Sequence, residues 1–202
     1  MATIYDLKPA FQNLLRPVCR FCARHGISAN AVTLAGVVLS AAGGAAILLA
    51  SHSDWPLLML PAILFVRMAL NAIDGMLAKE HDMKSNLGAI LNELGDVVAD
   101  TALYLPLAFV DGIPSWPVVI VTLLAIISEM TGVIGVQIGA SRRYDGPMGK
   151  SDRAFVFGAL ALALGLGVTR GDWIAYLLWA VSALLVITIV NRARRALQES
   201  PQ

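Results

Sequence analysis

Charged residues are scarce in this sequence. Only 14% of its 202 residues are Asp, Glu, Lys or Arg, whereas 57% are hydrophobic. Soluble globular domains carry about 25% charged residues, so this composition excludes an ordinary soluble domain and predicts a membrane protein. At roughly 20 apolar residues per crossing, the chain has room for about six helices and none for a separate soluble catalytic domain.

An excess of charge of one sign is also missing, because the formal net charge is +1. Proteins that bind nucleic acids neutralise phosphates with many cations, so we expect no nucleic-acid partner. The N-terminal segment lacks the charged start and unbroken apolar core of a signal peptide. We therefore expect the chain to be retained whole.

Cysteine is almost absent. The two cysteines, Cys19 and Cys22, form a C-x-x-C pattern. This pattern indicates a redox or zinc site only with a βαβ context or a second pair of ligands, and the only nearby candidate is His25. We interpret the cysteines as two small apolar residues one helical turn apart.

Long apolar segments are abundant and predict six transmembrane helices. They cover residues 31–50, 55–78, 87–110, 115–140, 154–168 and 173–190. The fifth segment is short and would need tilt or a thinner bilayer. Residues 3–25 alternate apolar residues with cations at helical spacing, which predicts an amphipathic helix on the membrane surface, the alternative being a soluble helix packed on a loop. The expected fold class is an all-α polytopic membrane protein with six transmembrane helices and an N-terminal amphipathic juxtamembrane helix.

Lysine and arginine fall on one side of this predicted topology. The cations on that side are Lys8, Arg16, Arg20, Arg24, Lys79, Lys84, Arg142, Arg143, Lys150, Arg153, Arg192, Arg194 and Arg195. The opposite loops hold one cation, Arg170. With six spans, the positive-inside rule places both termini of a multi-pass protein of the cytoplasmic membrane in the cytoplasm. The expected divisions are a juxtamembrane helix (1–27), a six-span membrane domain (28–195) and a cytoplasmic tail (196–202).

Two polar stripes interrupt the apolar segments. One face of the second predicted helix carries Arg67, Asn71 and Asp74, and one face of the third carries Gly88, Asn92, Asp96 and Asp100. Ionisable residues inside spans mark functional sites by default, and hard oxygen ligands near substrate phosphates suit Mg²⁺. The alternative is interhelical hydrogen bonding. Glu129, alone in the fourth segment, is expected to be a partner for Arg67 or a polar residue in a helix seam.

These residues resemble the motif of the CDP-alcohol phosphatidyltransferase family, D-x2-D-G-x2-A-R-x8-G-x3-D-x3-D. This chain has Asn71-x2-Asp74-Gly75-x2-Ala78-Lys79-x8-Gly88-x3-Asn92-x3-Asp96. Every spacing agrees. The departures are asparagine for aspartate at positions 71 and 92, and lysine for arginine at position 79. The predicted topology with its juxtamembrane helix also resembles the family.

The resemblance implies a phospholipid-biosynthesis enzyme that transfers a phosphatidyl group from CDP-diacylglycerol to an alcohol and releases CMP. In the family, four aspartates hold two divalent ions, Mg²⁺ or Mn²⁺, on the diphosphate of the donor. The candidate metal ligands here are Asn71, Asp74, Asn92 and Asp96. The candidate catalytic residues are Asp74 and Asp96, the latter orienting or deprotonating the acceptor hydroxyl. The resemblance also implies a homodimer surrounded by membrane lipids.

The asparagines at positions 71 and 92 weaken the expected metal site. Each offers a carbonyl oxygen but no charge, so we expect a lower metal affinity or the loss of one ion. Asp100, one turn beyond Asp96, is expected to support the ligands indirectly. An alternative function is a relative that has lost transfer and only binds a nucleotide lipid or a lipid head group. A transporter is disfavoured because the halves of the sequence show no symmetry.

Small residues accompany the motif. Gly75, Ala78 and Gly88 would let a nucleotide approach the helix backbone or would allow close helix packing. Lys79 would meet a phosphate as a point charge. The polar residues before and in the first predicted span are expected to cap its helix and, secondarily, to neighbour the nucleotide; they are Ser28, Asn30 and Thr33.

A basic loop leads into the fifth segment. Its cations, at the start of a predicted helix, favour an anion, so a phosphorylated or otherwise anionic acceptor is expected to bind there. Topology alone is the alternative reason for these cations. The four residues are Arg142, Arg143, Lys150 and Arg153.

Overall fold

The computed structural model describes residues 4–200, and in this range the chain is all-α. Residues 1–3 and 201–202, at the ends of the predicted N-terminal and C-terminal segments, lie outside the described residues. The helices are α1 (Ile4–Arg24), α2 (Ala29–Leu49), α3 (Trp55–Glu80), α4 (Asn86–Tyr104), the 3₁₀ helix η1 (Leu105–Phe109), α5 (Ser115–Gln137), α6 (Lys150–Gly165) and α7 (Trp173–Glu199).

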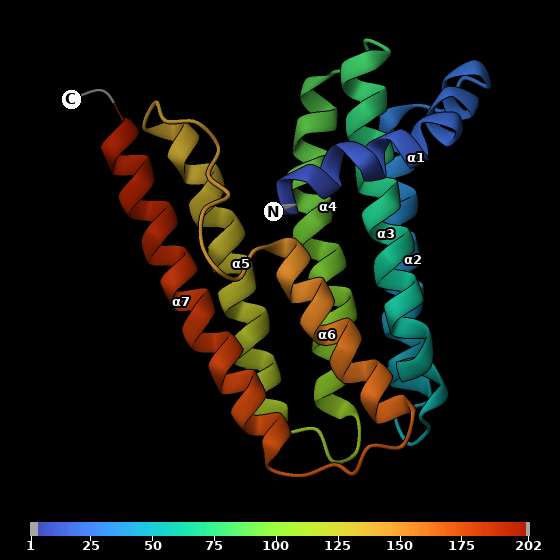
Figure 1. Cartoon of the computed structure of the whole chain (residues 1–202), viewed down its shortest axis with the longest axis vertical. Helices are drawn as coiled ribbons and strands as arrows, with labels where there is room; N and C mark the ends of the chain where they lie inside the picture. Colours follow the sequence, from blue (N-terminus) through green and yellow to red (C-terminus); the bar gives the residue numbers. More distant parts are fainter. Residues whose placement is uncertain (1–3, 201–202) are drawn as a thin grey trace.

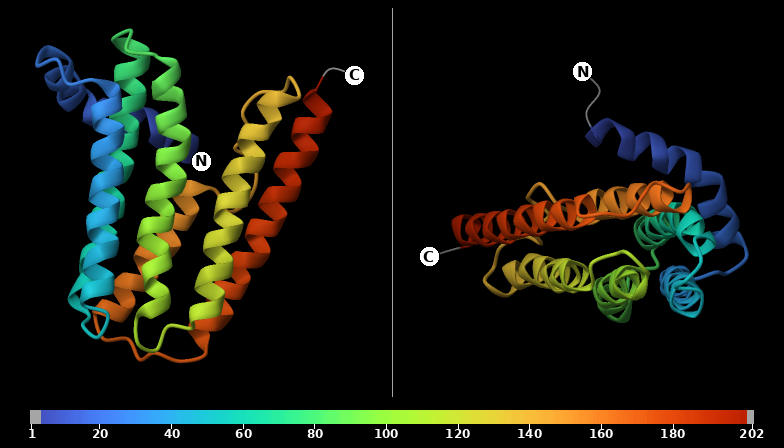
Figure 2. Two further views of the ribbon diagram at one scale, coloured as in Figure 1. Left: turned by 180° about the vertical axis from the view of Figure 1, so that it is seen from behind. Right: turned by 90° about the horizontal axis from the view of Figure 1, so that it is seen from below.

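Helices α2 to α7 run alongside one another, and α1 crosses the bundle near one end (Figures 1 and 2). Helix α2 packs against both α3 and α4, α6 packs against α3, and α5 packs against α7 and α4. Within the described residues, the backbones of α3 and α4 approach each other closely at few points. The two helices are joined instead by side chains of the two polar stripes, such as Asn71 with Asp96 and Arg67 with Asp100.

The number of transmembrane helices differs from the prediction. Within residues 4–200, only α2, α3, α5 and α7 are long and apolar enough to cross a membrane, so the prediction of six spans is wrong, although the all-α membrane class fits. Helix α4 carries three carboxylates among its 19 residues, and α6 is only 16 residues long. A short apolar segment is also what a buried core helix requires. Phe157, Leu160 and Leu164 of α6 are buried in this way in the core that α6 shares with α3.

Local chemistry explains where the helices begin and end. The Ser28 hydroxyl accepts a hydrogen bond from the Ala31 N–H at 3.2 Å, which confirms the predicted cap of α2. The Ser85 hydroxyl caps α4 in the same way. Pro106 lies in the 3₁₀ helix that follows α4, and a proline cannot continue the α-helical hydrogen bonding. The predicted third segment, 87–110, is therefore an α-helix only as far as Tyr104.

Helix α1 forms over most of the predicted segment 3–25. Its Cys19 and Cys22 are free and buried in a cluster with residues of α3, while Leu14 and Phe21 are exposed. Burial raises the pKa of the Cys19 thiol, which disfavours the reactive thiolate. Both cysteines therefore behave as the small apolar residues that the sequence predicted. The position of α1 on a membrane surface stays a prediction.

The segment between α5 and α6 returns into the bundle, so α6 begins near mid-height of the neighbouring helices (Figure 1). The Met148 N–H donates to the Thr188 hydroxyl of α7 at 3.0 Å. Gly146 has a φ of +117° and lies so close to Thr188 that a Cβ would approach its Cα to 2.6 Å. Glycine is therefore required at this close approach. This path brings the start of α6 beside the polar stripe of α4.

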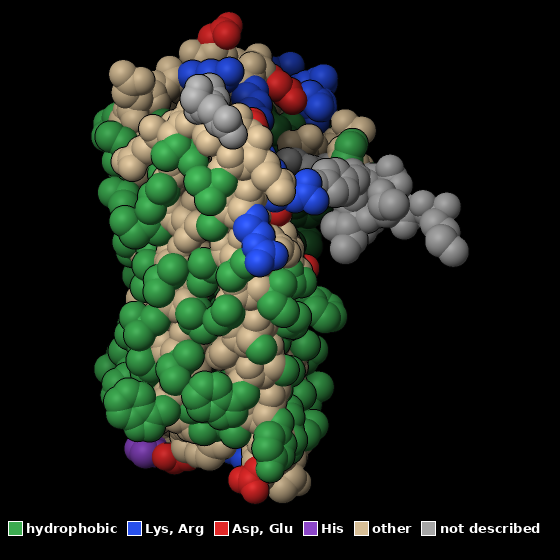
Figure 3. Space-filling model, turned by 90° about the vertical axis from the view of Figure 1, so that its left-hand side faces the viewer, with side chains coloured by type: hydrophobic (Ala, Val, Ile, Leu, Met, Phe, Trp, Pro, Cys, Tyr) green, Lys and Arg blue, Asp and Glu red, His purple; other side chains and the backbone are tan. Residues whose placement is uncertain are grey.

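On the face shown in Figure 3 the lower half of the bundle wall is mostly hydrophobic, and charged side chains lie at both ends and, in the upper half, down to about mid-height. At the end without the basic loops, His52 contacts Asp111 at 2.6 Å and Arg170 pairs with Asp54. The Asp111 carboxylate raises the pKa of His52 through their hydrogen bond. Helix α7 continues at the other end as far as Glu199, within the segment predicted as a tail. The separation of a basic end from a mixed end is the pattern on which the predicted orientation depends.

Candidate active site

Asp74 of α3 and Asp96 of α4 lie on the facing polar stripes. Asp74 is buried, and one of its carboxylate oxygens accepts a hydrogen bond from the Thr33 hydroxyl of α2 at 2.7 Å. The Thr33 hydroxyl oxygen also lies 3.1 Å from the Ala29 carbonyl oxygen, one turn earlier. A helix that packs on both α3 and α4 thus fixes the orientation of Asp74.

Asp96 is held by side chains from two other helices. Its Oδ1 accepts a hydrogen bond from Asn71 Nδ2 at 3.1 Å and forms an ion pair with Lys150 Nζ. Arg67 Nη2 lies 3.9 Å from the same oxygen and donates to the Asp96 backbone carbonyl at 3.1 Å. These contacts all involve Oδ1 or the backbone. The side chains of Asp96 and Lys150 remain 24% and 29% exposed, so molecules outside the protein can reach them.

The nitrogen and the oxygen of the Asn71 side-chain amide point toward different helices. Its nitrogen is directed to Asp96, and its carbonyl oxygen lies on the α2 side, 3.8 Å from where a Cβ would stand on Gly36. Asn71 therefore acts toward Asp96 as a hydrogen-bond donor, not as an oxygen ligand. Asn92 lies on α4, one turn before Asp96, and is partly exposed.

Buried ion pairs continue from this site through the bundle. Asp100 of α4 pairs with Arg67 of α3 and with Arg153 of α6, the latter at 2.8 Å. Glu129 of α5 lies 2.9 Å from Arg153 and 3.4 Å from Arg192 of α7. A buried charge is tolerated only when it is paired, and each of these has an opposite charge beside it. The network thus ties together the five helices that surround the polar space.

The structure decides between the two roles expected for Glu129. It pairs with arginines of α6, α7 and the loop before α6, while Arg67 pairs with Asp100. Glu129 is therefore a polar residue of a helix seam. Asp100 supports Asp96 indirectly, as expected, because Arg67 contacts both residues.

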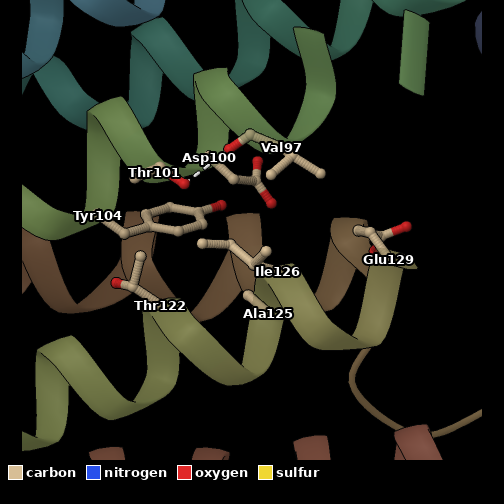
Figure 4. Close-up of a pocket in the computed structure, with 8 residues that line it drawn as sticks. All are labelled: Val97, Asp100, Thr101, Tyr104, Thr122, Ala125, Ile126 and Glu129. Atoms are coloured by element: carbon tan, nitrogen blue, oxygen red, sulfur yellow. Dashed lines mark hydrogen bonds between the residues drawn. The ribbon is translucent and has the colours of Figure 1, made fainter. Parts of the chain in front are cut away.

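A pocket between α4 and α5 adjoins this network (Figure 4). It is lined by Val97, Asp100, Thr101 and Tyr104 of α4 and by Thr122, Ala125, Ile126 and Glu129 of α5. The Tyr104 ring stacks on Phe157 with centroids 4.2 Å apart, and its buried hydroxyl has no hydrogen-bond partner among the described residues. This pocket leaves no room for a water molecule, so the space beyond Asp100 is closed by the packed side chains of α4 and α5.

The arginines of the basic loop pair with carboxylates of the neighbouring helices and of the loop itself. Arg142 forms a bidentate ion pair with Glu93 of α4, at 3.0 and 2.9 Å, and contacts Glu129 at 2.9 Å. Burial alone would lower the pKa of the Arg142 guanidinium, but the hydrogen bonds that it donates to Glu93 and Glu129 outweigh burial and raise the pKa. Arg143 pairs with Asp145 at 2.8 Å and with Glu199.

All four cations predicted to bind an acceptor anion are thus engaged by carboxylates. Arg153 is completely buried, whereas Arg142, Arg143 and Lys150 are partly exposed. An incoming anion can therefore reach the last three, but it cannot reach Arg153 without a rearrangement of the buried pairs.

The small residues of the motif have different surroundings. A Cβ on Gly75 would meet nothing within 4 Å, whereas a Cβ on Gly88 would approach the Asn30 side chain to 2.8 Å. Gly75 thus faces open space, as a nucleotide-binding position requires, and Gly88 allows close packing. Ala78 is partly buried against the α1 cluster, and Lys79 is exposed at the end of α3.

The donor set fits one divalent cation better than two. Hard cations prefer carboxylate and other oxygen ligands, and the motif supplies two carboxylates, Asp74 and Asp96. Among the described residues, no group of three or more His, Cys, Asp or Glu side chains is placed to hold a metal ion. One oxygen of Asp96 is moreover occupied by Lys150 and Asn71.

Comparison with known proteins identifies the family. The sequence pattern that defines the CDP-alcohol phosphatidyltransferases matches residues 27–190. The chain belongs to the CDP-alcohol phosphatidyltransferase family. It is 42% identical over 201 residues to the inner membrane protein YnbA of Escherichia coli, covering 99% of both chains. It is 24% identical over 208 residues to the phosphatidylinositol phosphate synthase of Mycolicibacterium smegmatis, covering 100% of this chain and 91% of the relative.

Solved structures share the fold of this CDP-alcohol phosphatidyltransferase. The phosphatidylinositol phosphate synthase of Mycobacterium tuberculosis with CDP-DAG bound has a TM-score of 0.77 and 19% identity, over 94% of this chain and 96% of that one. The same synthase in complex with manganese and citrate has a TM-score of 0.76 at 19% identity, over 93% and 90% of the two chains. The resemblance inferred from the motif is therefore confirmed for the family and for the fold.

Sequence reasoning missed the structural role of Arg192 in this transferase. We interpreted it as one of the cations that set topology, but its side chain is buried and donates to the Ser128 carbonyl of α5 at 2.6 Å. One indication was present in the sequence. Thr188 and Arg192 are spaced i, i+4, so both lie on the face of α7 that is buried.

Proposed function

We propose that this CDP-alcohol phosphatidyltransferase transfers the phosphatidyl group of CDP-diacylglycerol to an alcohol in the bacterial inner membrane and releases CMP. The observation that carries the proposal is the placement of Asp96, which is partly exposed, oriented through Oδ1 and adjacent to the motif on α3. The CDP-DAG bound to the mycobacterial synthase and the inner-membrane name of YnbA support the donor and the location.

In the proposed reaction, Asp96 accepts the proton of the acceptor hydroxyl. Oδ1 is engaged by Lys150 and Asn71, so Oδ2 is the oxygen assigned to this proton transfer. The acceptor oxygen forms a bond to the phosphorus that carries diacylglycerol, and the bond from that phosphorus to the oxygen of CMP breaks. A divalent cation bound by Asp74 and Asp96 would supply positive charge to the diphosphate. Positioning and charge neutralisation are the main contributions a protein makes to such transfers.

The donor is proposed to enter along α3. Gly75 leaves open space beside the motif, so the helix backbone is accessible to the cytidine diphosphate. Lys79, exposed at the end of α3, would contact a phosphate group. The acyl chains of the donor would remain in the surrounding lipid.

The acceptor is proposed to be a phosphorylated or otherwise anionic alcohol bound near the basic loop. Arg142 and Arg143 support this assignment because both are partly exposed cations of that loop. Both are paired with carboxylates, so an anionic acceptor would have to displace one of these partners.

A binding protein without transferase activity is the second candidate. The asparagines at positions 71 and 92 favour it, because they remove two charges from the motif, and Asn71 is turned to donate to Asp96. Such a protein would bind CDP-diacylglycerol without releasing CMP.

The test measures CMP release by purified protein from CDP-diacylglycerol with Mg²⁺ or Mn²⁺. Inositol phosphate and glycerol phosphate are compared as acceptors with inositol and glycerol. We expect release with a phosphorylated acceptor and a loss of about 100-fold or more in Asp96→Asn, as for removal of a general base. The matched control is Asp172→Asn, at an exposed aspartate of the opposite end.

Activity of Asp96→Asn within a few fold of wild type would contradict the role of Asp96. Release that is equal with the neutral alcohols would contradict the anionic acceptor. A wild-type protein that binds CDP-diacylglycerol and releases no CMP would support the binding protein instead.

A further inference from the structure

Lys150 is placed differently from the other cations of the basic loop. It is the first residue of α6, and the return of the preceding loop into the bundle brings it beside α4. Its ammonium group pairs with Asp96 Oδ1, the oxygen that also accepts the Asn71 amide. Arg142 and Arg143 pair with glutamates and an aspartate outside the motif. Lys150 is therefore the loop cation bound to a motif carboxylate.

The effect of the Lys150–Asp96 ion pair follows from the net charge of the motif. Its four positions supply two negative charges, from Asp74 and Asp96, because asparagine stands at positions 71 and 92. The Lys150 ammonium offsets one of them. A single divalent ion already exceeds the remaining negative charge, and a second would meet strong repulsion in a partly buried site.

We propose that the Lys150 ammonium is a resident cation on Asp96, and that the site binds one divalent cation where the family motif implies two. The proposal rests on the transferase site proposed above. Lys150 and the asparagines then have the same effect on the site. The asparagines reduce the number of carboxylates, and the Lys150 ammonium supplies a positive charge in place of the second ion. The neutral amide of Asn71 serves the same arrangement by donating to the oxygen that Lys150 binds.

This role differs from the acceptor-binding role that the sequence predicted for Lys150. A lysine that only binds an acceptor anion would not contact Asp96, so its removal should change metal binding little when substrates are absent. A lysine that occupies Asp96 competes with the metal for that carboxylate. The two roles therefore make different predictions for a binding experiment without substrate.

The experiment measures Mn²⁺ binding to purified full-length protein by equilibrium dialysis, without substrates. The variants are Lys150→Met, which keeps the length of the side chain and removes its charge, and Lys150→Arg, which keeps a charge. Lys84→Met is the control, at an exposed lysine between α3 and α4. A triple variant combines Lys150→Met with Asn71→Asp and Asn92→Asp.

We expect one Mn²⁺ per wild-type chain. Lys150→Met should bind Mn²⁺ about tenfold more tightly, since a neighbouring unit charge in a site of intermediate dielectric contributes at least that factor. Lys150→Arg and Lys84→Met should stay close to wild type, and the triple variant should bind two ions. Size-exclusion chromatography identifies variants that fail to fold. Lys150→Met tests the loss of the charge, and Lys150→Arg tests whether another cation at position 150 keeps the wild-type affinity.

Two ions on the wild-type chain, no detectable ion, or equal Mn²⁺ affinity in wild type and Lys150→Met would overturn the proposal. CMP release is measured in parallel. If the Mn²⁺ pattern holds and no CMP is released, the transferase function fails and the assignment of Lys150 stands. If CMP is released and the Mn²⁺ pattern is absent, the assignment of Lys150 fails alone.

Discussion

The two asparagines of the motif differ in what they contact. Asn71 donates its amide to Asp96 across the space between α3 and α4, while Asn92 lies partly exposed on the same helix as Asp96. The sequence treats them as equivalent, because both stand where the family has aspartate. In the structure, Asn71 is hydrogen-bonded to Asp96, whereas Asn92 only lies near it.

Restoring aspartate should therefore have different effects at the two positions. Asn71→Asp removes a donor and places a second acceptor against Asp96, which should destabilise the metal-free protein by about 1–3 kcal/mol. Asn92→Asp should change stability by less than about 0.5 kcal/mol. Thermal unfolding in detergent, with and without Mn²⁺, measures both effects, and saturating Mn²⁺ should recover the stability of Asn71→Asp.

In both single variants the Mn²⁺ concentration that gives half-maximal CMP release should fall, because each adds a negative charge near the cation. Equal destabilisation of the two variants without metal would contradict the role assigned to the Asn71 amide. A rise in the half-maximal concentration would show that the asparagines belong to a site of another kind.

Single residues also mark the limit of what the sequence predicted. The polar stripes and their shared faces followed from helical spacing, and Asn71 and Asp96 do meet between α3 and α4. The contact of Lys150 with Asp96 joins residues 54 positions apart, and it depends on a loop that returns into the bundle. No periodicity encodes that path, so the partner of Lys150 could not be predicted.

At the scale of helices, two glycines have different roles: one allows two helices to pack closely, and the other leaves space beside the motif. Gly44 of α2 lies against α4, where an added Cβ would approach the Ala102 carbonyl oxygen to 1.9 Å. The obstacle is backbone and cannot rotate away, so α2 and α4 would have to separate. Gly75 of α3 faces open space instead.

Alanine at these two glycines should give opposite results. Gly44→Ala should destabilise the protein by several kcal/mol, at or above the ~1–3 kcal/mol typical of overpacked cores, and lower its level in the membrane. Gly75→Ala should leave stability unchanged or raise it by about 0.5–1 kcal/mol, the gain in helix propensity, and raise the KM for CDP-diacylglycerol. Thermal unfolding and steady-state CMP release measure the two effects. A Gly75→Ala variant with an unchanged KM would place the nucleotide elsewhere.

The helices themselves were predicted better than their relation to the membrane. Each apolar segment contains a helix, because apolar runs bounded by turn residues determine helices whether lipid or protein covers them. The apolar runs alone could not separate these two environments for α4 and α6, whereas charge and length could. The three carboxylates of α4 and the shortness of α6 distinguish these helices from the four long apolar ones.

For the whole molecule, the bundle separates a basic end from an end with few cations. The loops at the latter end carry the His52–Asp111 and Arg170–Asp54 pairs. The α3–α4 connection, with Lys84, lies at the basic end with the C-terminus of α7 (Figure 1). Helix α3 is one of the four candidate spans and joins the two ends. Its two ends therefore provide a direct test of orientation.

We expect the basic end to face the cytoplasm, since cytoplasmic loops carry the excess of Lys and Arg. The test uses Ser53→Cys and Lys84→Cys, exposed positions beyond opposite ends of α3, in a background with Cys19→Ala and Cys22→Ala. A membrane-impermeant maleimide should label position 53 in spheroplasts and position 84 only after the membrane is permeabilised. The reverse pattern would show that the protein is inverted, and labelling of both positions in spheroplasts would contradict a crossing by α3.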